Sequence, residues 1–284
     1  MGKNTVKTFV FLALLTSLLL FAGSLFSRGY LIMIPIVVLM NFAGYFWSDK
    51  MVLRATHSRP VTEQEAPWLY KIVRELTQKN GMPMPKLYIM PASQPNAFAT
   101  GRNPQHAAVA VTEGILGVLD EEELKGVLAH EISHVHNRDI LIGAVAAMVA
   151  GAITLIARMA MWGAMFGGGD RDDNNSPLGA IGAILGIILA PIAALLIQMA
   201  VSRSREAQAD ASGAKLLGDA TPLAHALVKI DAAAKTTAPM NVSPAVSHVF
   251  LQNPFRGQNV SKLFLSHPPL EQRLAQLREL GAKI

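Results

Sequence analysis

The sequence predicts a mainly α-helical protein that contains a small β-sheet and several transmembrane helices. Of the 284 residues, 51% are hydrophobic and only 16% are charged, whereas soluble domains carry about 25% charged residues. The apolar residues are concentrated in four blocks, each about as long as a helix that crosses the hydrocarbon core of a bilayer. The polar sequence between and after these blocks contains the helix and strand patterns of a small folded domain.

Charge and cysteine content narrow the classes of function. The net charge of +5 is typical of a membrane protein with Lys and Arg on its cytoplasmic side. No basic run with interleaved aromatic residues predicts a nucleic-acid surface. The chain has no cysteine, which excludes disulfides, a thiol nucleophile and Cys-ligated zinc. Any metal ion must therefore be held by His and carboxylate side chains.

Two apolar blocks lie at the start of the chain, over residues 9–26 and 30–47. Neither block contains a charged residue, and three residues separate them. Residues 1–47 are therefore predicted to form two transmembrane helices joined by a tight turn. A cleaved signal peptide is the alternative for the first block, since Lys3 and Lys7 precede it.

The other two apolar blocks lie within residues 140–201 and flank a loop rich in Asp and Asn. They predict a transmembrane or membrane-embedded helical hairpin. Arg158 lies near the far end of the third block, where its long side chain can reach the membrane interface. A buried helical hairpin in a soluble core is the alternative, because a charge inside lipid is costly.

Residues 48–139 are predicted to form a cytoplasmic domain. The capping box of Thr62 to Glu65 predicts a helix that ends before Gly81. A second capping box, Asp120 to Glu123, begins a helix that we expect to extend to about Arg138.

Two β-branched and apolar runs predict strands in the same domain, over residues 87–90 and 107–111. Residues 96–101 are expected on the connection between these strands. The sheet is therefore predicted to be small and to precede the second helix.

That second helix carries His130-Glu131-Ile132-Ser133-His134. Helical residues four apart lie on one face, so both histidines can bind one zinc ion, and Glu131 can reach a water molecule on the metal. Catalytic zinc sites have three protein ligands and one open position. The residues from Val135 to Asp139 supply no downstream Gly and third His of the metzincin type. The motif thus predicts a zincin domain of the gluzincin-like type, with an acidic third ligand.

Glu206 is the best candidate for that ligand, with Asp139 as the alternative. Asp210 lies one helical turn after Glu206 and can orient a zinc-bound histidine. If residues 140–201 cross the membrane twice, residues 202–284 return to the side of the histidines and complete the zinc site. Lys and Arg predominate on that side, so it is predicted to be cytoplasmic.

These motifs resemble the HtpX heat-shock membrane proteases, which are relatives of the CAAX prenyl endopeptidases. The resemblance rests on residues 127–139, on residues 206–210 and on the two predicted spans between them. Residues 96–101 and the run from Ser266 to Pro269 also look like motifs of that family. The similarity covers nearly the whole chain.

The resemblance implies a protein of the bacterial inner membrane. The four apolar blocks make it multi-pass, and the positive-inside rule predicts that both termini are cytoplasmic. The resemblance implies that His130, His134 and Glu206 bind one Zn2+ per chain and that Glu131 is the catalytic residue. It also implies a stress-response role in protein quality control, with misfolded or damaged membrane proteins as substrates.

The expected reaction is hydrolysis of a peptide bond by zinc-activated water, with Glu131 as general base. Polypeptide substrates are expected to bind extended along a sheet edge near Asn96, Ala97, Phe98 and Ala99. His267 is a candidate second donor to the oxyanion.

Two other classes of protein remain open at this point. An intramembrane site-two-type protease places H-E-x-x-H inside a span, whereas charged residues flank the motif here. A membrane scaffold without catalysis, or a zinc-binding membrane protein, would not depend on Glu131.

Overall fold

The computed structural model describes residues 45–139, 205–242, 249–252 and 268–284, together with single positions before residue 45. The predicted spans over residues 9–26, 30–47 and 140–201 lie almost entirely outside the described residues, so their structure is not assigned. Within the described stretches, no helix has both the length and the apolar character needed to cross a membrane.

A four-stranded sheet organises the described domain, with strand order β1-β2-β4-β3. The strands are β1 (Arg59–Pro60), β2 (Lys86–Met90), β3 (Ala97–Gly101) and β4 (Ala107–Thr112). β2 runs parallel to β4, while β1 and β3 run antiparallel to their neighbours. The sheet is therefore mixed, and β3 is one of its edges.

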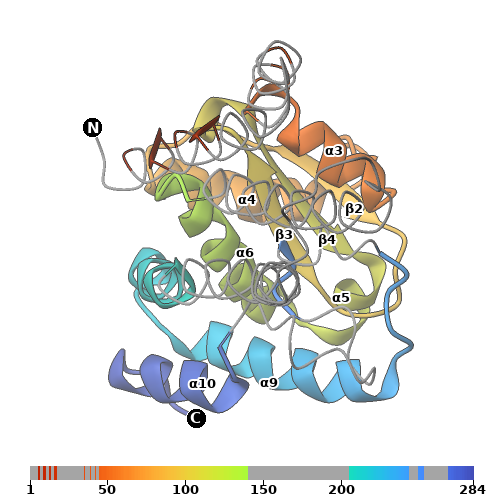
Figure 1. Ribbon diagram of the computed structural model, residues 1–284. Helices are drawn as coiled ribbons and strands as arrows, with labels where there is room; N and C mark the ends of the chain where they lie inside the picture. Colours follow the sequence, from red (N-terminus) through yellow and green to blue (C-terminus); the bar gives the residue numbers. More distant parts are fainter. Residues whose placement is uncertain are drawn as a thin grey trace, which may run out of the picture.

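Helices make up most of the remaining described chain (Figure 1). They are α3 (Ser48–Ala55), α4 (Pro67–Lys79), α5 (Glu113–Val118), α6 (Glu121–His136), α9 (Thr221–Thr236) and α10 (Leu270–Glu279). A further helical stretch covers residues 205–217, and a 3-10 turn, η1 (Pro104–His106), precedes β4. The prediction of a mainly helical fold with a small sheet is confirmed.

Both faces of the sheet are covered. Ala107, Val109 and Val111 of β4 join the larger apolar core, which α4, α6 and α9 also supply. Ala108 and Ala110 point to the other face and join a smaller core with α3. Because successive side chains of a strand alternate between faces, every residue of β4 is buried.

α6 is the central helix of the domain and begins as predicted. The side chain of Asp120 accepts a hydrogen bond from the Glu123 backbone, and the Glu123 side chain accepts one in return from the Asp120 backbone. The helix ends at His136, two residues before the predicted end, because Arg138 adopts a left-handed φ of 56°. Such a conformation cannot continue an α-helix.

The predicted start of α4 was wrong, although its end before Gly81 is confirmed. Glu65 Oε2 accepts a hydrogen bond of 2.7 Å from the Thr62 backbone, but residues 63–65 form a turn that precedes the helix. The residue before a proline is disfavoured in the α region, and Ala66 accordingly has φ −138°. The helix therefore starts at Pro67, where a proline is well tolerated.

The predicted strands over residues 87–90 and 107–111 are confirmed as β2 and β4. Residues 96–101 lie on the connection between these two strands as expected, and residues 97–101 form a further strand, β3, that was not predicted from the sequence. Both faces of β3 carry buried apolar side chains, Ala97 and Ala99 on one and Phe98 on the other, so polar and apolar residues do not alternate. The strand therefore lacks the usual sequence signal.

Candidate metal centre

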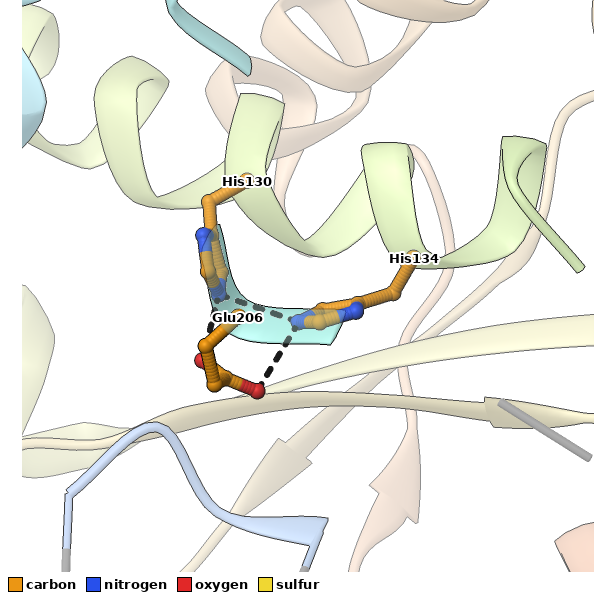
Figure 2. Close-up of side chains that lie close together, drawn as sticks. All are labelled: His130, His134 and Glu206. Carbon is orange, nitrogen blue, oxygen red and sulfur yellow. Dashed lines mark hydrogen bonds and ion pairs between the residues drawn. The ribbon is translucent and has the colours of Figure 1, made fainter. Parts of the chain in front are cut away.

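α6 places His130 and His134 one turn apart on a buried face of the helix. Their Nε2 atoms lie 3.0 Å from each other, and both rings point to the same side of the helix (Figure 2). Because the Nε2 atoms of the two rings lie this close, both can bind the same metal ion.

Glu206 approaches these nitrogens from the helical stretch over residues 205–217 (Figure 2). Its Oε2 lies 3.4 Å from Nε2 of His130, and its Oε1 lies 3.5 Å from Nε2 of His134. Gly213 permits this approach, since a Cβ there would lie 3.1 Å from the backbone nitrogen of His130. The structure thus brings Glu206 to two histidines that lie far from it in the sequence.

The three side chains fit a zinc ion. One ligand atom from each of His130, His134 and Glu206 lies within 4.8 Å of the others, and all three residues are buried. In a tetrahedral zinc site, bonds of 2.0–2.1 Å separate neighbouring ligand atoms by roughly 3.3 Å. The two Nε2 atoms lie 3.0 Å apart, and each has one of the two Glu206 oxygens at 3.4–3.5 Å, so the carboxylate lies close to both histidine ligand atoms. Two imidazoles and one carboxylate also form a donor set that zinc prefers.

The Nδ1 atom of His130 lies 2.8 Å from Oδ1 of Asp210. Asp210 is fully buried and also binds Arg273 of α10, whose Nε and Nη2 lie 3.0 Å and 2.6 Å from its two oxygens. A carboxylate at Nδ1 makes that nitrogen the protonated one, so Nε2 keeps its lone pair for a metal ion.

The second histidine has a different carboxylate partner. Nδ1 of His134 lies 3.0 Å from Oδ2 of Asp139, which follows the end of α6. Nη1 of Arg205 donates a hydrogen bond of 3.2 Å to the Asp139 backbone carbonyl and so links this turn to the stretch that carries Glu206. Both rings are therefore oriented through their outer nitrogens.

The site attracts cations. Burial alone would lower the pKa of His130, but Asp210 and Glu206 outweigh this effect and raise it to about 10. Burial alone would also lower the pKa of His134, but Asp139 and Glu206 raise it. The carboxylates that stabilise a proton on these rings also favour a metal ion. The metal ion binds the ring nitrogen in place of the proton.

The pKa of Asp210 shows the opposite shift. Burial alone would raise it, but Arg273 and His130 hold it at about 2. Asp210 is therefore ionised over the physiological range, as a hydrogen-bond acceptor for His130 must be.

Glu131 lies beside His130 on α6 and is buried. Burial lowers the pKa of Arg273, but nearby carboxylates outweigh burial and raise it. The largest of these effects comes from Asp210, followed by Glu206, and the charge of Glu131 adds to them. The carboxyl group therefore lies within electrostatic reach of the metal centre.

Of the predicted substrate-binding residues, Asn96 to Ala99 lie at the β3 edge and are buried. The segment over residues 249–252 already covers the start of this edge. The Leu251 backbone N–H donates to the carbonyl of Ala97 at 3.1 Å, and the Asn96 amide exchanges hydrogen bonds of 2.7 Å and 3.0 Å with the Gln252 backbone.

Farther along, Phe98 turns its ring toward Phe250, with ring centroids 5.3 Å apart. The backbone carbonyl of Ala97 points away from β4, toward Leu251. Backbone groups of an antiparallel edge strand alternate between the partner strand and the open side, so those of Ala99 also point away from β4. His267 lies outside the described residues.

Sequence reasoning missed two residues of this site. Asp139 was considered as an alternative ligand but not as a partner of His134. Its signal is the short distance from the end of a metal-binding helix. Arg273 was not singled out at all, and its signal is weak, because most arginines are exposed.

The chain is also similar to known proteins. The chain matches the profile of peptidase family M48 over residues 63–281. "Protease HtpX homolog" of Pelotomaculum thermopropionicum is 48% identical over 280 residues, which are 98% of this chain and 99% of that protein. The protein of the same name from Persephonella marina is 47% identical over 286 residues, covering 99% of each chain.

A solved structure is also similar. The crystal structure of Ste24p from S. mikatae aligns with a TM-score of 0.52 and 23% sequence identity. The alignment covers 97% of this chain, which spans 63% of that one. At this level of identity the likeness concerns the fold.

Proposed function

Because the chain belongs to peptidase family M48, we propose that it is a zinc-dependent endopeptidase that cleaves polypeptides at a membrane surface. The family makes the chain a metallopeptidase. The observation that carries the choice of zinc is the buried group of His130, His134 and Glu206, in which one ligand atom from each residue lies within 4.8 Å of the others.

In this proposal Nε2 of each histidine and the carboxylate of Glu206 hold the metal ion. Zinc would supply a Lewis acid that lowers the pKa of water and polarises a carbonyl group. Asp210 and Asp139 keep the two rings in the tautomer that binds a metal ion.

Glu131 is the proposed general base. Its carboxylate takes a proton from the attacking water as the oxygen adds to the peptide carbonyl carbon. When the C–N bond breaks, the same carboxyl group returns that proton to the leaving amine. Water is thus divided between the new carboxyl and amino termini, and Glu131 ends in its starting state.

The substrate is proposed to be an extended polypeptide that pairs with the outward backbone groups of β3. Since residues 249–252 occupy the edge at Ala97, the backbone of Ala99 and Gly101 is the proposed place for this pairing. Asn96 and Phe98 then support the strand from behind rather than contact substrate. His267 remains the proposed second donor to the oxyanion.

We also propose that the protein is a multi-pass protein of the bacterial inner membrane, with its active site and both termini cytoplasmic. The four apolar blocks and the distribution of Lys and Arg support this topology. Relatives named as HtpX proteases support a role in quality control of misfolded or damaged membrane proteins under stress.

A metal assay combined with self-cleavage tests the function. Purified wild-type protein should contain one zinc ion per chain and cleave itself, and a chelator should stop the cleavage. Glu131→Gln should retain zinc and lose cleavage. Glu122→Gln, which changes an exposed carboxylate on the same helix, is the matched control and should behave as wild type.

A non-catalytic scaffold predicts a different result. In that case Glu131→Gln and wild type would process peptides at the same background rate. Loss of zinc from Glu131→Gln would instead show that this residue is a ligand and not the general base.

A further inference from the structure

α10 is a polar helix with one buried arginine. Arg273 is 4% exposed, whereas Arg278, on the same helix, is exposed. Arginine is almost never fully buried unless its charge is paired. Burying this side chain therefore requires a specific partner.

That partner is Asp210, which is 0% exposed. The guanidinium binds both carboxylate oxygens, at 3.0 Å through Nε and at 2.6 Å through Nη2. Oδ1 of Asp210 in turn lies 2.8 Å from Nδ1 of His130, closer than Nη2 of Arg273, which lies 3.4 Å from the same nitrogen. An unbroken polar chain thus runs from α10 to a proposed zinc ligand.

α10 also contacts the ligand-bearing stretch at a second point. Nε2 of Gln276 donates a hydrogen bond of 2.8 Å to the backbone carbonyl of Ala207, beside Glu206. Figure 1 shows α10 lying along α9 at the end of the chain. The C-terminal helix therefore contacts residues 205–217 both at Asp210 and at Ala207.

We propose that Arg273 is a positioning residue of the metal centre, which acts through Asp210 on His130. This inference rests on the proposed zinc site. By binding both oxygens, Arg273 fixes the rotation of the Asp210 carboxylate and leaves Oδ1 aimed at Nδ1 of His130. The ring of His130 is then held with Nε2 toward Glu206, where a metal ion binds.

The planar fork of arginine is what this role requires. A guanidinium binds a carboxylate through two parallel N–H groups, and this fixes its orientation. The ammonium group of lysine is a point charge that can neutralise Asp210 without fixing the rotation of its carboxylate. Charge and geometry can therefore be separated by substitution.

The test measures the affinity of full-length protein for Zn2+ by competition with a chromogenic chelator. Arg273→Gln should weaken zinc binding about 10- to 100-fold, the range for outer partners of ligating histidines. Arg273→Lys should recover only part of this loss. The control Arg278→Gln should bind zinc as wild type does.

A second measurement separates positioning from a general loss of folding. If Arg273 acts through Asp210, adding Arg273→Gln to Asp210→Asn should cost little further zinc affinity. Losses that add in the double variant would overturn the proposal. The visible spectrum of Co2+-loaded protein should also shift in Arg273→Gln, because the ligand geometry changes; an unchanged spectrum would count against positioning.

Failure of this inference is distinct from failure of the proposed function. If wild type and Arg278→Gln bind no zinc, the proposed metal site itself is wrong. If both bind zinc and Arg273→Gln binds it equally tightly, only the role of Arg273 is overturned.

Discussion

Oδ2 of Asp139 lies 3.0 Å from Nδ1 of His134, just beyond the end of the helix that carries the histidine. The left-handed conformation of Arg138 turns the chain back at this point. The Asp139 backbone N–H then donates to the carbonyl of His134 at 3.2 Å. One residue therefore both closes the helix and orients a ring of the metal centre.

Asp139→Asn should weaken zinc binding about 10- to 100-fold without abolishing it. The amide can still accept one hydrogen bond, but it no longer stabilises positive charge at the ring. Chelator competition with purified protein measures the change, and Glu122→Gln serves as the exposed acidic control. Complete loss of zinc would instead identify Asp139 as a ligand.

Glu206→Ala should reduce zinc affinity by more than the roughly 10- to 100-fold expected for Asp210→Ala, because it removes a ligand rather than an outer partner. The metal content of both variants after dialysis checks the order. If Glu206→Ala kept zinc as tightly as wild type, another acid would have to complete the site.

Gly126→Ala should destabilise the domain. The added Cβ would lie 2.6 Å from the backbone nitrogen of Leu223 and 2.8 Å from the carbonyl carbon of Pro222, where α6 and α9 meet. Overpacking of this kind costs about 1–3 kcal/mol. Thermal unfolding should therefore begin several degrees lower than in wild type.

Gly117→Ala is the matched control, because nothing lies within 4 Å of the added Cβ. Gly117 is exposed in α5, where alanine is favoured over glycine by up to about 1 kcal/mol. This variant should be as stable as wild type or slightly more so. Equal destabilisation of both variants would contradict the close contact of α6 with α9.

Single cysteines can test the proposed hairpin over residues 140–201, since the chain has no cysteine of its own. In intact cells, an impermeant thiol reagent should label Asn174→Cys from outside. Lys215→Cys, at an exposed position of the helical stretch that carries Glu206, should react only after the membrane is opened. Protection of both positions would favour a hairpin that stays on the cytoplasmic side.

α6 shows what could be predicted from the sequence. Its cap, the pair of histidines and the following acid are all local features, so spacing alone sets their relative positions. The approach of Glu206 required a topological argument, in which two crossings return the chain to one side. The structure brings Glu206 to the histidines, while the crossings themselves stay a prediction.

β3 and the start of α4 could not be predicted in the same way. β3 is buried on both faces, so its residues show no alternation of polar and apolar side chains, and its pairing with β4 is a tertiary effect. At α4, the capping box of Thr62 to Glu65 predicted an earlier start than the one observed, because Pro67 disfavours the helical conformation at Ala66 and the helix begins only at Pro67.

The burial of Arg273 could not be predicted for a different reason. Nothing in the sequence of a polar helix tells which arginine is buried, because the partner that compensates its charge lies 63 residues away. Only the packing of α10 against the ligand-bearing stretch selects Arg273 over Arg278.

The order of the metal-centre residues along the chain has a consequence for biosynthesis. Both histidines are translated first, Glu206 follows much later, and Arg273 comes close to the C-terminal end. If His130, His134 and Glu206 hold the metal ion as proposed, a ribosome-bound chain that ends before Glu206 holds only two of the three ligands. The proposed peptidase would then lack a complete metal site until Glu206 has been translated and has packed against α6.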